Sequence, residues 1–368
     1  MKYLLYISLF FSVLTNCSDE DSDSDVRESI ETQLTYQPLV SLKELASFPV
    51  GMIVSAQKLA TNTQFKEYLN NDFNSITAEN DMKMRSIFIG PNNYDFSKGD
   101  AIISYAKQNG FRVFGHALIW HSSIPDWLVN FTGTDMAFEE LIETYIKETV
   151  AHFSQEKMIL NGQEISVVAG WDVVNEAFTD AAQNAVFRTR LGDDYVAKCF
   201  QWAREADPHV KLFYNDYNLE SQSSKMVEVI GMLDDFTTRN IPIDGIGMQM
   251  HIDYISPSIQ TIQSNLNALL QKDVLIHFSE LDMTVNKTGS LSELTFLRAK
   301  SQEDKYRAVA ELYSEIPENK RFGITLWGMR DVESWLLNFH GNINEYPLLF
   351  DASYNFKLAH RGFSEGLN

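Results

Sequence analysis

Two apolar runs in this chain each end in a glutamate. Residues 171–177 read Trp-Asp-Val-Val-Asn-Glu-Ala, a β-branched run that stops at an Asn-Glu pair, and residues 274–278 lead directly into Glu280 and Asp282. Such runs are typical of buried strands, so both glutamates are expected at the carboxyl ends of strands. A protonated carboxyl group can donate a proton to a leaving oxygen, while an ionised one attacks or activates water. The two runs therefore predict a single acid–base site.

The two carboxyl groups need different surroundings for this chemistry, because one must keep its proton and the other must lose it. Asp282 lies two residues after Glu280, and His251 on the preceding run can bridge the two acids, which favours an ionised Glu280. Glu176 follows Asn175 and apolar strand residues, which favour retention of its proton. A single strand-end glutamate is more often a helix cap or a surface charge, so the prediction depends on both together.

The elements that must position these residues follow a regular order. From about residue 40 onward, amphipathic stretches alternate with apolar runs over residues 48–54, 73–77, 111–115, 165–175, 211–215, 243–249, 274–278 and 322–326. Eight alternating β and α units predict an α/β fold, a closed (β/α)8 TIM barrel that forms a single catalytic domain over residues 39–368. An open doubly wound sheet is the alternative, but the first run lacks a glycine-rich phosphate loop. Residues 154–164 are extra length, with a hairpin turn expected at Asn161-Gly162.

Polar and aromatic residues follow the runs of this barrel, where the loops line one mouth. Every run from the second to the eighth ends in such residues: Glu79, Asn80 and Lys83, His116 and Trp120, Asn175 and Glu176, Asn215, Gln249 and His251, Glu280 and Asp282, and Trp327 and Trp335. This pattern predicts one cleft. Four tryptophans near these ends are expected to offer flat platforms for sugar rings: Trp120, Trp127, Trp327 and Trp335. Packing in the core is the alternative for them.

Metal and nucleic-acid chemistry are not expected. His116, His121 and His251 could be zinc ligands, but no second cluster of Cys or His completes a site, so neither a metal nor a cofactor is predicted. The formal net charge is −20 and the sequence has no basic run, which opposes binding to a phosphate backbone. Cys199 falls on an apolar stripe of helical spacing and is interpreted as a packing residue.

Seven ordered segments carry a family resemblance. They are residues 73–80, 115–121, 171–177, 215–218, 249–251, 279–282 and 327–335. Together they resemble glycoside hydrolase family 10, the endo-1,4-β-xylanase family, and the resemblance runs from about residue 44 to the carboxyl end. It implies a retaining enzyme that hydrolyses internal β-1,4-xylosidic bonds of xylan by double displacement.

The resemblance also implies a role for each catalytic residue. Glu176 would be the general acid/base and Glu280 the nucleophile. Asn175 would hold the 2-hydroxyl of the reacting sugar, while His251 and Asp282 would orient Glu280. The implied partners are xylan and xylooligosaccharides, and we expect a monomer.

A set of substrate-binding residues is implied in the same way. The sugar in the −2 subsite would contact Glu79, Asn80 and Lys83. The −1 subsite would be lined by His116, Trp120 and Gln249, with Asn215 also among the binding residues. Trp327 and Trp335 would form the walls of the cleft. They would leave little room for a C6 hydroxymethyl group and so favour xylose.

Three positions depart from the family pattern. Ser123 stands where the family usually has Gln, which affects one hydrogen bond to the sugar, while Met84 and Leu358 replace Trp and Pro and are interpreted as packing changes. None touches the catalytic pair. Two alternative functions remain: a related β-1,4-glycanase acting on cellooligosaccharides or mixed-linkage glucan, and a catalytically weak lipoprotein that captures glycans.

The amino terminus predicts export. Residues 1–16 resemble a bacterial lipoprotein signal peptide, because Lys2 and a short apolar run precede Cys17, which would carry the lipid. An ordinary secretory signal with an incidental cysteine is the alternative. Residues 17–38 are expected to form an acidic flexible tether. The expectation is a lipoprotein held by outer-membrane lipid at the cell surface of a Bacteroidetes-type bacterium.

Overall fold

The computed structural model describes residues 36–160, 162–178 and 185–367. The described residues from Gln37 onward form one compact unit. The predicted signal peptide, Cys17 and most of the predicted tether lie outside the described residues, as does Asn161 of the predicted turn.

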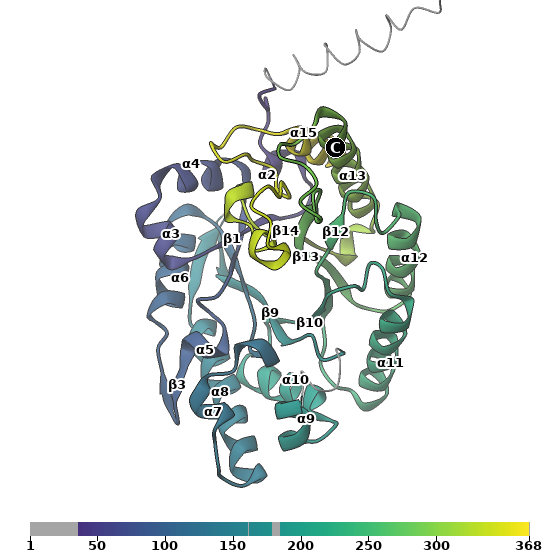
Figure 1. Ribbon diagram of the computed structural model, residues 1–368. Helices are drawn as coiled ribbons and strands as arrows, with labels where there is room; N and C mark the ends of the chain where they lie inside the picture. Colours follow the sequence, from purple (N-terminus) through teal and green to yellow (C-terminus); the bar gives the residue numbers. More distant parts are fainter. Residues whose placement is uncertain (1–35, 161, 179–184, 368) are drawn as a thin grey trace, which may run out of the picture. The chain divides into compact units, whose positions relative to one another are not determined.

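Eight parallel strands close into a barrel, which confirms the predicted (β/α)8 fold (Figure 1). In ring order they are β1 (Val50–Val54), β2 (Ser75–Ala78), β5 (Arg112–Gly115), β9 (Val168–Asn175), β10 (Lys211–Asp216), β11 (Gly245–Met248), β13 (Leu275–Thr284) and β14 (Arg321–Leu326). Each pairs in parallel with the next, and β14 pairs with β1. All residues of β1, β2 and β11 are buried, which explains why these strands read as continuous apolar runs.

Helices follow each barrel strand and surround the barrel, as Figure 1 shows. The main ones are α4 (Thr63–Asp72), α6 (Ser97–Asn109), α8 (Asp135–Ser154), α10 (Tyr195–Ala206), α11 (Ser223–Arg239), α12 (Ile259–Leu270), α13 (Phe296–Ser314) and α15 (Leu358–Gly366). Shorter ones are α2 (Leu42–Leu45), α3 (Ala56–Thr61), α5 (Met84–Ile87), α7 (Asp126–Val129), α9 (Ala185–Leu191) and α14 (Leu336–His340). Gly110 ends α6 with a φ of 75°, a left-handed conformation that glycine adopts at little cost.

Two predicted strands differ in the structure. The run over residues 165–175 is divided between β8 (Gln163–Ser166), which pairs with β7 (Lys157–Leu160) in an antiparallel hairpin, and the barrel strand β9. The run over residues 274–278 continues to Thr284, because β12 (His251–Asp253) pairs with the second half of β13. Glu280 and Asp282 therefore lie within a strand, and not after it.

Aromatic side chains fill the barrel interior. Phe114, Phe213 and Phe322 come from β5, β10 and β14 and pack against one another, with ring centroids 4.5 to 5.4 Å apart. His277 of β13 packs edge-on against Phe114. Because four strands contribute to this cluster, the barrel has a packed core and functional residues must lie at its mouth.

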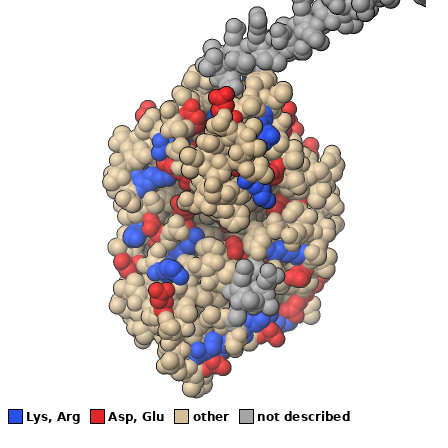
Figure 2. Space-filling view, in the orientation of Figure 1, with Lys and Arg blue, Asp and Glu red and all other residues tan. Residues whose placement is uncertain are grey.

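The surface and the helices agree with a globular domain. On the face drawn in Figure 2, Lys and Arg side chains are interspersed with Asp and Glu side chains. Among the described residues, no helix has both the length and the apolar character needed to cross a membrane. Cys199 is fully buried in α10, as its predicted packing role requires.

Candidate active site

Glu280 lies in the longest strand of the barrel and is almost completely buried, with 5% of its surface exposed. Its Oε1 accepts a hydrogen bond of 2.7 Å from Asn215 Nδ2, and its Oε2 lies 3.3 Å from His251 Nε2. His251 Nδ1 lies 2.9 Å from Asp282 Oδ1, so this histidine bridges the two acids as the sequence predicts. Trp335 Nε1 donates to the other oxygen of Asp282 over 2.8 Å. Asn215 of β10 and His251 of β12 thus hold the Glu280 carboxylate, and Asp282 and Trp335 hold the histidine in turn.

Electrostatics favour an ionised Glu280. Burial acts to raise its pKa, but the hydrogen bond from His251 and the charges of His116, His251 and Lys83 outweigh burial and place the pKa below its ordinary value. Burial likewise acts to lower the pKa of His251, yet the charge and hydrogen bond of Asp282, together with those of Glu280, hold it well above its usual range. A protonated His251 between two carboxylates is therefore the stable arrangement.

Glu176 ends β9 and has three nitrogen donors around its carboxylate. Trp120 Nε1 donates to Oε2 over 2.8 Å, while Gln249 Nε2 and Asn175 Nδ2 donate to Oε1 over 3.0 and 3.2 Å. His121 Nε2 lies 4.0 Å from Oε2. The expected apolar surroundings are therefore wrong: β6 (Ile119–Trp120) pairs with β9, and Gln249 reaches in from β11.

A chain of amides joins the two glutamates. Asn215 Nδ2, which donates to Glu280, also donates to Asn175 Oδ1 over 2.8 Å, and Gln249 Nε2 lies 3.4 Å from the same oxygen. Ser279 Oγ donates to Asn215 Oδ1 over 2.6 Å. A Cβ on Gly247 would lie 2.2 Å from that Oδ1, so only glycine leaves room for this amide. These contacts bring the two glutamates together at one mouth of the barrel.

His116 and Lys83 complete the mouth of the barrel. His116 Nδ1 lies 2.8 Å from Asp172 Oδ2, and its ring packs edge-on against Trp327 at 5.3 Å. Lys83 Nζ lies 4.5 Å from the centroid of the Trp120 ring and donates to Asn80 Oδ1 over 3.3 Å. Burial lowers the pKa of this lysine, against the attraction of the neighbouring glutamates, which are Glu280, Glu79 and Glu176.

Sequence reasoning missed two supports of the site. Asp172, buried beside His116, has its pKa raised to about 6, chiefly by burial and despite that histidine. Tyr214 Oη accepts from the backbone N–H groups of Ala177 and Phe178 over 3.0 and 3.1 Å and donates to Asp216. Asp172 and Tyr214 could have been found from the sequence, because each is a charged or hydroxyl-bearing residue inside an apolar strand run.

Trp127 packs against Phe88, in agreement with the packing alternative for this tryptophan. Its indole N–H donates to the Phe88 carbonyl over 2.8 Å, and its ring packs edge-on against the Phe88 ring at 4.7 Å. This tryptophan therefore has a packing role near β3 (Phe88–Gly90) and β4 (Asn93–Tyr94). Met84 and Leu358 are fully buried, in agreement with their interpretation as packing changes, and Ser123 is buried in a 3-10 turn.

Three residues at the strand ends have left-handed backbones. Glu176, Asn218 and Met250 have φ values of 60°, 61° and 63°. A positive φ is uncommon for residues other than glycine and is found preferentially at functional sites. Glu176 N donates to the carbonyl of Asn215 over 2.9 Å, which holds the turn at the end of β9.

Comparisons with known proteins agree with this geometry. A sequence profile of glycosyl hydrolase family 10 matches residues 41–365. Endo-beta-1,4-xylanase Xyn10C of Cellvibrio japonicus is 34% identical over 356 residues, which cover 89% of this chain, and this chain spans 57% of its length. Endo-1,4-beta-xylanase B of Thermotoga neapolitana is 32% identical over 335 residues, which cover 89% of this chain and 91% of that relative.

Solved structures give the same result. A variant of xylanase 10C from Cellvibrio japonicus, in complex with xylopentaose, matches with a TM-score of 0.83 and 34% identity over 89% of this chain and 69% of that chain. The profile match covers the whole barrel, and the relatives share both sequence and fold. This chain therefore belongs to glycosyl hydrolase family 10.

Proposed function

We propose that this protein is a retaining endo-1,4-β-xylanase that hydrolyses internal bonds of xylan. The observation that carries the proposal is the pair of glutamates at the mouth of the barrel, Glu176 and Glu280, which amide side chains join but whose surroundings differ. Glu280 is nearly buried and faces a protonated histidine, whereas Glu176 is more exposed and faces neutral N–H donors. Two carboxyl groups with distinct surroundings are what glycoside hydrolysis requires.

The first step forms a covalent intermediate. A Glu280 oxygen attacks the anomeric carbon, the bond from that carbon to the glycosidic oxygen breaks, and Glu176 transfers its proton to this leaving oxygen. His251 and Asn215 hold the Glu280 carboxylate in place for the attack. In the second step Glu176 takes a proton from water, the water oxygen bonds to the anomeric carbon, and Glu280 is released. Two inversions at one carbon give net retention.

The remaining residues of the mouth bind the sugar. Asn175 is suited to hold the 2-hydroxyl of the reacting sugar, because its amide lies between the two carboxylates. A further set surrounds this position and supplies hydrogen bonds: Glu79, Asn80, Lys83, His116, Trp120, Asn215 and Gln249. Trp327 and Trp335 wall the cleft and leave little room for a C6 hydroxymethyl group, which favours xylose over glucose.

Reducing-sugar release from xylan tests the proposal, with carboxymethyl-cellulose as the competing substrate. Glu280→Gln should lower turnover on the order of 10⁴-fold or more, as loss of a covalent nucleophile does in other enzymes. Glu176→Ala should lower it by about 10²–10⁴-fold on xylan but much less on aryl xylosides, whose good leaving groups need no proton. Glu205→Gln, which changes an exposed surface glutamate of α10, is the control. Xylobiose release at the wild-type rate by Glu280→Gln would refute the nucleophile assignment.

We also propose that Cys17 is lipidated and holds the enzyme at the cell surface. The short apolar run before this cysteine and the acidic segment after it support the proposal. Cys17→Ala should move xylanase activity from the membrane fraction to the soluble fraction. Activity that stays with the membranes in this variant would contradict lipid anchoring.

A further inference from the structure

An exposed phenyl ring lies beside the proposed substrate cleft. Trp335 precedes α14 and Phe339 lies four residues further along, so both side chains project from the same side of this helix. Their ring centroids are 4.9 Å apart. Because Trp335 also donates to Asp282 and packs against the His251 ring at 5.0 Å, Phe339 extends the aromatic surface outward from the Glu280 side of the site.

Packing does not account for Phe339. Its surface is 68% exposed, and it is the one aromatic among the described large apolar residues that are exposed. A ring that buries so little area contributes little to folding. Single exposed apolar residues are common, so exposure alone is not informative. The position next to Trp335, together with the rigid support of the helix, is what points to a function.

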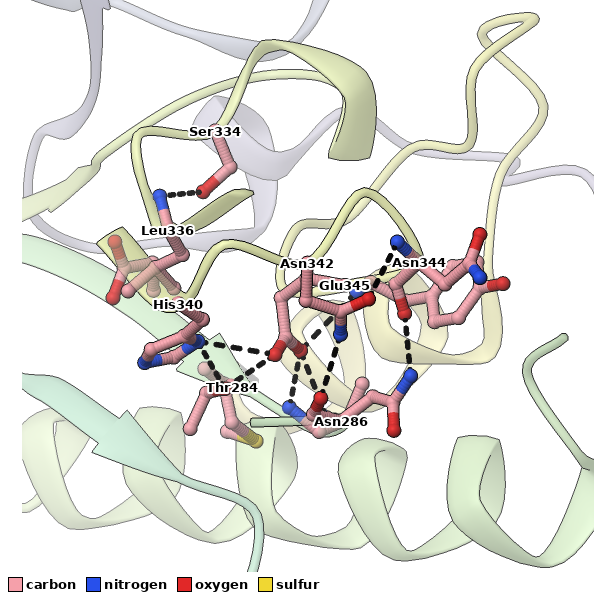
Figure 3. A network of polar contacts seen from close by, with 12 residues as sticks. Thr284, Asn286, Ser334, Leu336, His340, Asn342, Asn344 and Glu345 are labelled. Carbon is pink, nitrogen blue, oxygen red and sulfur yellow. Dashed lines mark hydrogen bonds and ion pairs between the residues drawn. The ribbon is translucent and has the colours of Figure 1, made fainter. Parts of the chain in front are cut away.

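A buried carboxylate supports the segment that carries this ring (Figure 3). Glu345 Oε2 accepts from Thr284 Oγ1 over 2.7 Å, and its Oε1 accepts from the backbone N–H groups of Val285 and Asn286 over 2.6 and 2.9 Å. Glu345 is 1% exposed. The loop after β14 is therefore fastened to the loop after β13, the strand that carries Glu280.

Further contacts fasten the carboxyl end of α14 itself. His340 Nδ1 lies 3.3 Å from Glu345 Oε2, and Asn342 Nδ2 donates to the Asn286 carbonyl over 2.7 Å. Asn286 Nδ2 donates in return to the Asn344 carbonyl over 2.8 Å. Figure 3 shows these side chains converging between the two loops. Both ends of the helix are thus held, Trp335 at one and His340 at the other, so Phe339 has a fixed place.

We propose that Phe339 binds a sugar ring of the substrate beyond the sugars held at the two glutamates. This inference deepens the proposed function and depends on it. The phenyl face offers apolar contact to the C–H face of a sugar, which either the xylose main chain or an arabinose branch presents. Phe339 would therefore determine specificity for long or branched substrates, with Asn342 as a positioning residue.

Calorimetric binding to inactive Glu280→Gln protein tests this role, with and without Phe339→Ala. Three ligands are compared: xylobiose, linear xylohexaose and arabinose-substituted xylohexaose. Loss of one aromatic contact should weaken binding of the longer ligands about 2- to 10-fold and leave xylobiose unchanged. Phe339→Tyr, which keeps the aromatic ring, should bind the longer ligands as tightly as the protein with Phe339 does. Met136→Ala, which removes a 79% exposed apolar side chain from α8, is the matched control.

The ligands distinguish the two sources of the sugar. Weaker binding of both xylohexaoses indicates the main chain, and weaker binding of the substituted one alone indicates the branch. Asn342→Ala should reproduce part of the loss on the same ligand without affecting xylobiose, which a merely structural role would not do. Unchanged affinity for every ligand in Phe339→Ala overturns the inference while the proposed function stands. Failure of the Glu280→Gln protein to bind any xylooligosaccharide would overturn both.

Discussion

Gly247→Ala is expected to lower activity, because the added methyl group would displace Asn215, the residue that holds Glu280. The added Cβ would lie 2.2 Å from Asn215 Oδ1 and 2.9 Å from Asn215 Cγ. Asn215 is fully buried and cannot swing into solvent, so its amide must move about 1 Å to reach an ordinary contact distance. That movement breaks the 2.7 Å hydrogen bond that holds Glu280 and the 2.6 Å bond from Ser279.

The magnitude follows from these contacts. Overpacking of a core costs about 1–3 kcal/mol, and loss of a hydrogen bond to a charged group costs about 1.5–3 kcal/mol. Gly247→Ala should therefore lower the free energy of unfolding by about 2.5–6 kcal/mol. Displacement of Glu280, the proposed nucleophile, by about 1 Å should lower kcat/KM on xylotetraose about 100-fold.

Denaturant unfolding and steady-state kinetics measure the two effects. Gly231→Ala is the matched control, because a Cβ at this exposed position in α11 meets no atom within 4 Å, and it should be neutral or slightly stabilising. In an Asn215→Ala background the destabilisation by Gly247→Ala should largely vanish, since only the Cβ contact at 3.2 Å remains. A Gly247→Ala enzyme that keeps kcat/KM within threefold of wild type would refute the reasoning.

Two further predictions concern supports of the glutamates. His251→Gln removes a positive charge that lowers the pKa of Glu280, against the effect of burial, so the acid limb of kcat/KM on an aryl xyloside should move to higher pH. The exposed His209→Gln should leave that limb in place, and an unmoved limb in His251→Gln would contradict the assignment. Tyr214→Phe removes the hydroxyl that accepts from the Ala177 and Phe178 N–H groups and donates to buried Asp216, and it should cost about 1–3 kcal/mol of unfolding free energy. The surface change Tyr105→Phe should cost under about 0.5 kcal/mol. Equal Tm values for the Tyr214→Phe and Tyr105→Phe proteins would show that the Tyr214 hydroxyl does not stabilise the fold.

The fold and the central pair of residues could be predicted from the sequence. Strands buried on both faces read as apolar runs, and the barrel brings all their carboxyl ends to one mouth. Those two facts place Glu176 and Glu280 together without knowledge of any contact. The contact between His251 and Asp282 was also predictable, because the two residues follow neighbouring apolar runs in the sequence.

Contacts across the mouth could not be predicted in the same way. The donors around Glu176 come from Trp120 and Gln249, and their reach depends on how β6 and β11 are aligned with β9. The length of β13 depends on its pairing with β12, which a periodicity within one segment does not encode. Trp127 looked like a platform because it follows a strand end, yet the Phe88 carbonyl takes its N–H.

The left-handed backbones at the strand ends limit how this enzyme can be engineered for heat tolerance. Each such conformation costs a residue other than glycine about 1 kcal/mol, and the barrel sustains three of them: Glu176, Asn218 and Met250. Asn218 bears the smallest part of this cost, because asparagine adopts a left-handed conformation more readily than most residues do. Substitution by glycine at Glu176 would remove the proposed proton donor, and at Met250 it would shift the neighbours Gln249 and His251, so thermostability gained there would lower turnover.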